Sequence, residues 1–181
     1  MEETLGTILP ITWRYFPLEQ VNSDKGDDWK LWEQPAGHRS RGRAAFQAAI
    51  AATKQGDEAY RRFHLSLLRA KHERGLDHGR RQTLMEVAGE AELDLAAFEK
   101  DLEDRSQLGL IGADYERGRR LGAFGTPTLV FAPDAAFYLK LQPKELVDQP
   151  VELFESIVKS AIERPYLLEL KRPTKPSANG T

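Results

Sequence analysis

The sequence has no cysteine among its 181 residues. Without a thiol, this polypeptide can form no disulfide, bind no metal through a thiolate, and offer no cysteine nucleophile or redox-active pair. This is the strongest exclusion that the composition gives.

The sequence also lacks an excess of charge of one sign and lacks long apolar runs. Its 26 lysines and arginines nearly balance 28 aspartates and glutamates, for a formal net charge of −2. Such a balance provides no net positive charge that would attract nucleic acid or an anionic membrane. No apolar run approaches the roughly 20 residues that a membrane-spanning helix needs. The first six residues, MEETLG, have no basic-plus-apolar signal pattern. We therefore expect a cytoplasmic protein with no nucleic-acid or membrane partner.

Apolar residues recur at helical spacing through the middle of the chain. In the clearest segment, Asp57–Glu73, the side chains of Phe63, His64 and Leu67 fall on one face, and Asp57 is the expected N-cap. Further helices are expected over Arg43–Lys54, Gln82–Ala91, Asp94–Asp104 and Arg105–Leu121. Asp94 can cap the third of these segments. The three glycines of the last segment either allow close packing or weaken that helix.

Strand patterns lie on both sides of this helical block. The β-branched and aromatic run Ile11–Phe16 predicts a strand, and Thr128–Phe131 and Ala136–Leu141 predict a hairpin. Pro150 opens a last amphipathic helix, and the tail from Lys171 is rich in Pro, Lys, Ser and Gly and is expected to be disordered. The order of elements predicts one α/β domain interrupted by an all-helical insertion.

Three histidines, His64, His72 and His78, lie close together in the sequence and raise the question of a metal site. With Asp77 they could supply ligands, but their spacing matches no standard ligand set, and His64 falls on the apolar face of its helix. We therefore expect packed or solvated histidines and no metal.

The segment from His38 to Arg43, HRSRGR, gathers basic side chains. It could bind phosphate, or it could be the solvated start of a helix. Because no aromatic residues are interleaved with the basic ones and the overall charge is balanced, the solvated helix start is the favoured interpretation.

The segment Gly125-Thr126-Pro127 is the strongest candidate for a functional site. It places a proline directly before a predicted strand, in a tight approach that begins with glycine, where context can fix a cis X–Pro bond. A cis-proline would turn the preceding carbonyl and amide outward and offer an extended substrate two backbone groups. An ordinary trans-proline at a strand start is the alternative, and the residues alone leave the two open.

These residues resemble a known family. The run GTPTLVF at 125–131 resembles the cis-proline segment of DsbA-like thioredoxin-fold proteins. Three other segments resemble, in order, parts of the FrnE-type oxidoreductase branch of that family. They are WRYFPLEQVN at 13–22 for the second core strand and its exit, FHLSLLRAKH at 63–72 for the helical insertion, and PYLLELKRP at 165–173 for the C-terminal end.

The resemblance implies an α/β thioredoxin-like fold of the DsbA type. Residues 1–40 and 122–172 would form the core, 41–121 the all-helical insertion and 173–181 the disordered tail. In that family a first core strand and a helix with a Cys-x-x-Cys pair precede the segment matched by Trp13, so this chain is expected to lack both. Truncation relative to the ancestor is the favoured explanation. Direct pairing of the flanking strands, or a strand donated by a second copy, are the alternatives.

The resemblance also implies thiol–disulfide exchange, for which this chain has no cysteine. We therefore expect a redox-inactive relative of these oxidoreductases, with no catalytic residue and no cofactor. Gly125, Thr126 and Pro127 would bind a peptide or thiol substrate. A non-catalytic peptide- or thiol-binding module is the alternative, and an isomerase or glutathione-transferase-like reaction is a weaker third, since no nucleophile for it can be named. If a core strand is missing, a second copy of the chain could pair with the exposed strand edge and form a homodimer.

Overall fold

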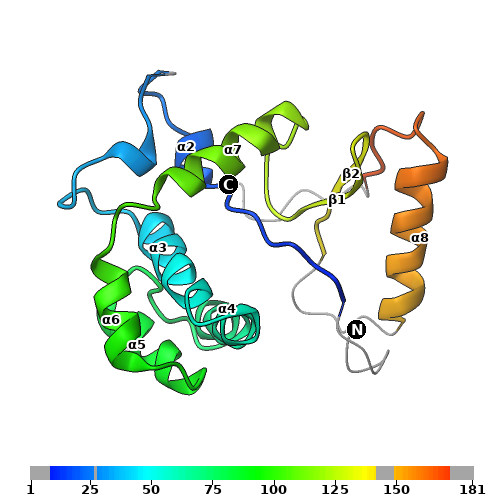
Figure 1. The fold of residues 1–181 in the computed structure, drawn as a ribbon. Coiled ribbons are helices and arrows are strands. Elements are labelled where there is room, and N and C mark those ends of the chain that lie inside the picture. The colour runs from blue at the N-terminus through cyan, green and yellow to red at the C-terminus, as the bar shows by residue number, and fades with distance from the viewer. Residues whose placement is uncertain (1–8, 27, 142–148, 172–181) are drawn as a thin grey trace, which may run out of the picture. The chain divides into compact units, whose positions relative to one another are not determined.

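The computed structural model describes residues 9–26, 28–141 and 149–171. The chain divides into two compact units, whose elements Figure 1 shows. The helical unit is Thr12–Gly125, and the hairpin unit combines Met1–Ile11 with Thr126–Thr181. The tail 173–181 that we expect to be disordered lies outside the described residues.

The helical unit contains the predicted helical block. Its elements are α2 (Leu18–Val21), the short 3-10 helix η1 (Leu31–Glu33), α3 (Arg41–Thr53), α4 (Asp57–His72), α5 (Arg81–Glu90), α6 (Leu95–Glu103) and α7 (Gly109–Arg120). Helix α7 begins four residues later than predicted, because a turn precedes it in which the Ser106 N–H donates to the Asp104 carboxylate. No helix among the described residues is long and apolar enough to cross a bilayer.

The core of the helical unit is built on the alanine-rich face of α3. Ala48, Ala51 and Ala52 are fully buried. Their small side chains let α3 pack directly against α4, α5 and α6, a grouping visible in Figure 1. Across this group the ring centroids of Phe63 and Phe98 lie 5.3 Å apart. The helical block therefore has its own contiguous apolar core.

Glycines of α7 allow close packing, as one of the two sequence interpretations predicts. A Cβ atom at Gly112 would lie 2.5 Å from the Trp32 ring, and one at Gly118 would lie 2.8 Å from the Phe16 ring. A Cβ atom at Gly109 would meet nothing within 4 Å. Two of these glycines thus seat aromatic rings against the helix backbone.

The predicted strand over Ile11–Phe16 is wrong, since this segment has no regular secondary structure. The Tyr15 N–H donates to Asp114 Oδ2 of α7 at 3.0 Å, and the Trp13 ring lies 4.2 Å from the His64 ring of α4. Aromatic and β-branched residues favour a strand only where a neighbouring strand completes the ladder. Here side chains of two helices hold the segment instead.

Helix starts depend on local side chains and glycine. The N-cap of α4 is Gly56, with φ 101°, so the prediction of Asp57 as the cap is wrong by one residue. Asp57 occupies the first helical position, where its negative charge interacts favourably with the positive end of the helix dipole. The prediction of Asp94 as the cap of α6 is confirmed, because its carboxylate accepts from the N–H groups of Ala96 and Ala97.

The hairpin unit contains the predicted hairpin and last helix. Strands β1 (Thr128–Ala132) and β2 (Ala135–Tyr138) pair antiparallel and form the two-stranded sheet of the described chain. Helix α8 (Pro150–Glu163) begins at the predicted proline and contacts both strands. The Phe131 and Phe154 rings meet edge to face at 5.9 Å, which fixes the helix on the hairpin.

Candidate functional site

The loop Gly125-Thr126-Pro127 leads directly into β1. The Thr126–Pro127 peptide bond is cis, the isomer that the sequence left undecided. Thr126 and Pro127 are exposed and Gly125 is half-buried. The loop is therefore accessible to a ligand at the residues that sequence reasoning singled out.

Backbone hydrogen bonding divides the loop into a fixed half and an open half. The Pro127 carbonyl accepts from the Leu139 N–H at 3.0 Å, which extends the ladder of the hairpin beyond β1. Thr126 makes no hydrogen bond within the part of the chain that the structure describes. The N–H and C=O of this exposed residue thus have no partner in the described chain and lie next to a strand, an arrangement that an added extended segment can satisfy.

The loop offers a ligand backbone groups and one hydroxyl group. Among the three loop residues the single reactive side chain is the Thr126 hydroxyl, which is a weak nucleophile unless a base activates it. An apolar neighbour precedes the loop, because the Phe124 side chain is 64% exposed. Backbone groups without partners in an exposed loop can recognise an extended peptide through hydrogen bonds.

His64, one of the candidate metal ligands, lies in an aromatic cluster. Its ring is 4.2 Å from that of Trp13 and 5.7 Å from that of Tyr60. Burial lowers the pKa of His64, and its Nε2 atom is buried without a hydrogen-bond partner among the described residues. Burial, with a smaller contribution from the Asp114 charge, raises the pKa of Tyr15 in the same region to about 12. The cluster therefore favours neutral side chains.

The other two histidines lie apart from that ring stack. His72 is the exposed last residue of α4. His78 is half-buried beyond the helix, and burial, the Lys71 charge and the Arg41 charge lower its pKa. In the described ranges no three His, Cys, Asp or Glu side chains are grouped so that they could hold a metal ion.

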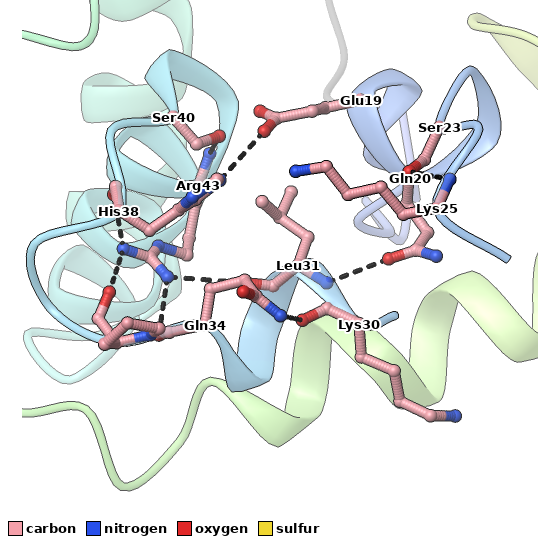
Figure 2. A network of polar contacts seen from close by, with 11 residues as sticks. Glu19, Gln20, Ser23, Lys25, Lys30, Leu31, Gln34, His38, Ser40 and Arg43 are labelled. Atoms are coloured by element: carbon pink, nitrogen blue, oxygen red, sulfur yellow. Dashed lines mark hydrogen bonds and ion pairs between the residues drawn. The ribbon is translucent and has the colours of Figure 1, made fainter. Parts of the chain in front are cut away.

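The basic segment 38–43 is more than a solvated helix start. Ser40 caps α3 by accepting from the Arg43 N–H at 3.1 Å, as a helix start requires. Arg43 itself is only 5% exposed, so the prediction of a solvated side chain is wrong at this position. Its guanidinium donates to four backbone carbonyls, as Figure 2 shows. They belong to Leu31 (3.3 Å), Gln34 (2.8 Å), Pro35 (3.0 Å) and His38 (2.7 Å).

A second side chain, Gln20, completes this network. Its amide donates to the Trp29 carbonyl and its oxygen accepts from the Leu31 N–H, both at 2.8 Å. Glu19 lies 3.1 Å from the ring of His38. Figure 2 places these side chains around η1. The polar network gives the irregular connection between α2 and α3 a defined shape, which local sequence patterns did not reveal.

The elements described here are those of a thioredoxin-like protein in which a proline loop enters a hairpin and a helical block precedes it. The chain matches the family model of the DSBA-like thioredoxin domain over residues 10–148 and belongs to that family. The predicted α/β thioredoxin-like fold of the DsbA type with a helical insertion is thereby confirmed. No curated protein matches the chain.

Proposed function

We propose that this polypeptide is a redox-inactive member of the DsbA-like family that binds an extended peptide or a thiol compound at the loop Gly125-Thr126-Pro127. The observation that carries the proposal is the exposed Thr126, whose backbone N–H and C=O have no partner in the described chain. The absence of cysteine from the 181 residues removes the thiolate that attacks a disulfide in thiol–disulfide exchange.

The hairpin supports such a binding role because it is a preformed base for the loop. Pro127 is tied to Leu139 by a backbone hydrogen bond, and α8 packs on the strands through Phe154. A ligand strand that pairs with Thr126 would meet a backbone already ordered before binding. Pre-ordering lowers the entropic cost of the complex.

The redox part of the proposal is tested with the purified 181-residue chain. In an insulin-reduction assay and a dithiol-oxidation assay, the rate with the protein should equal the rate in buffer with the same reductant or oxidant. Turnover above that background would overturn the redox-inactive assignment, because it would show that a residue other than cysteine supports the reaction.

The binding part is tested by fluorescence anisotropy with labelled unfolded peptides and by calorimetry with glutathione. Thr126→Pro removes the backbone N–H donor, whereas Thr126→Ser keeps both backbone groups and a hydroxyl. One neutral hydrogen bond contributes about 0.5–1.5 kcal/mol, so Thr126→Pro should weaken binding roughly two- to tenfold and Thr126→Ser should leave it unchanged. Binding of neither ligand class by the parent chain would refute the binding module.

A further inference from the structure

A cavity of about 760 Å³ lies within the helical unit, and no residue of the proline loop belongs to its lining. It is bounded by the segment before and at the start of α3, by the turn before α5, and by the end of α6. Its volume falls within the range of about 300–1,000 Å³ that small-molecule sites occupy.

The lining of this cavity is strongly basic. Six arginines contribute to it, namely Arg39, Arg41, Arg43, Arg80, Arg81 and Arg105. They face three carboxylates, those of Glu19, Asp77 and Glu103. The excess of three positive charges is concentrated here although the chain as a whole carries a net charge of −2. The local excess is also felt by Arg43, whose pKa is lowered by burial and by the neighbouring Arg105.

Most of these guanidinium groups already have partners inside the protein. Arg43 is bound to four carbonyls, and Arg105 donates to the Gln34 carbonyl at 2.6 Å. Arg81 pairs with Glu99 at 2.9 Å and also with Glu103. These arginines build the wall of the cavity.

Arg39 and Arg41 differ from the others. Both are exposed, and neither has an ion pair or hydrogen bond from its guanidinium within the described ranges. The backbone at Gly79 packs so closely on Arg41 that a Cβ atom there would lie 2.5 Å from Arg41 Cγ. The stem of Arg41 is therefore held while its charged end lacks a protein partner.

A smaller cavity of about 140 Å³ shares one wall with the basic cavity. It is lined by Leu84 and by five residues that also line the larger cavity, namely Ala44, Gln47, Gly79, Arg81 and Leu102. Ala44, Leu84 and Leu102 give this side space an apolar part, which suits a ligand with an anionic head and a small apolar body.

We propose that this arginine-lined cavity binds a small organic phosphate, with its phosphoryl oxygens held by Arg39 and Arg41 and its apolar part beside Leu102. The planar fork of a guanidinium group matches the oxygens of phosphate and forms charge-assisted hydrogen bonds with them. The three carboxylates of the lining and the overall negative charge of the chain disfavour a long polyanion such as nucleic acid.

The probes are phenyl phosphate, which has an apolar ring, and inorganic phosphate, which has none. Calorimetry on the full chain at low ionic strength should show one site for phenyl phosphate, with affinity at least about fivefold above that for inorganic phosphate and falling as salt is added. Absence of phenyl phosphate binding, or equal affinity for the two probes, would overturn the proposal.

Paired variants assign the binding to the cavity. Arg39→Gln with Arg41→Gln should weaken phenyl phosphate binding by about tenfold or more, because two charge-assisted contacts are lost. The matched control, Arg119→Gln with Arg120→Gln, removes the same charge from exposed positions of α7 outside the lining and should leave affinity within about twofold. Equal losses in both double variants would refute the assignment.

A variant that is expected to strengthen binding shows that the losses in the other variants do not come from unfolding. Glu103→Gln removes a carboxylate from the lining and releases Arg81 from one partner, so it should tighten phenyl phosphate binding by a few fold. Unchanged or weaker binding would contradict the electrostatic argument. Binding of a single-stranded oligonucleotide without binding of phenyl phosphate would also overturn the proposal, in favour of a nucleic-acid interface.

Discussion

Replacement of Arg43 tests whether one buried guanidinium orders the connection into α3. In Arg43→Met the apolar stem is kept, and the hydrogen bonds to the four carbonyls are lost. The Leu31 carbonyl belongs to a fully buried residue, and after the replacement it would lose its charged donor and keep only the Gln34 N–H at 3.3 Å. The other three carbonyls lie on half-buried or exposed residues, where water can replace part of each bond.

Hydrogen bonds to a charged group contribute about 1.5–3 kcal/mol each, whereas removing the charge recovers part of its desolvation cost. Together these effects give an expected loss of about 3 kcal/mol in the free energy of unfolding. Urea denaturation followed by tryptophan fluorescence measures this loss of stability. The signal reports on the helical unit, because all three tryptophans (Trp13, Trp29 and Trp32) lie there.

The control for this experiment is Arg41→Met, which changes an exposed arginine two residues earlier and should alter stability by no more than about 0.5 kcal/mol. A loss below about 1 kcal/mol for Arg43→Met, or equal losses for the two variants, would refute the inference that the network holds the connection.

Two further predictions concern packing and pH. Gly112→Ala would force a methyl group against the Trp32 ring and should destabilise the protein by about 1–3 kcal/mol, whereas Gly109→Ala meets no neighbour and should be neutral or slightly stabilising in thermal unfolding. Because burial lowers the folded-state pKa of His64, the unfolded state takes up its proton first, and stability should be full above about pH 6.5 and fall below it. His64→Gln should flatten that fall in urea titrations between pH 7 and 5, and exposed His72→Gln should not; equal slopes in the two variants would contradict the assignment.

The sequence predicts those parts of the fold whose signal is local. Helix α4 and the cap of α6 follow from apolar spacing and a single aspartate, and the hairpin follows from two adjacent runs of strand-forming residues. The strand predicted over Ile11–Phe16 is wrong because a strand needs a neighbouring strand, and the composition of a segment does not show whether one is present. Likewise the burial of Arg43 depends on carbonyls up to twelve residues away, for which a basic run gives no sign.

The same distinction applies to the two sites. The proposed binding loop Gly125-Thr126-Pro127 is contiguous, so the sequence alone could single it out as a candidate, although the isomer of its peptide bond came only from the structure. The basic cavity combines Arg39 and Arg41 with arginines about 40 and 65 residues further along the chain, so only folding reveals it. The sequence alone favoured a solvated surface for residues 38–43, because the other arginines of the lining are remote in the sequence.

The loop and the cavity share no residue, so the two proposals make separable predictions. Thr126 belongs to the hairpin unit, and Arg39 and Arg41 belong to the helical unit. Substitutions at sites that share no residues or partners normally have additive effects on free energy. Thr126→Pro should therefore weaken peptide or glutathione binding while leaving the dissociation constant for phenyl phosphate within about twofold, and the double arginine variant should do the reverse. A tenfold cross-effect in either direction would show that the sites are coupled and would contradict the independence assumed here.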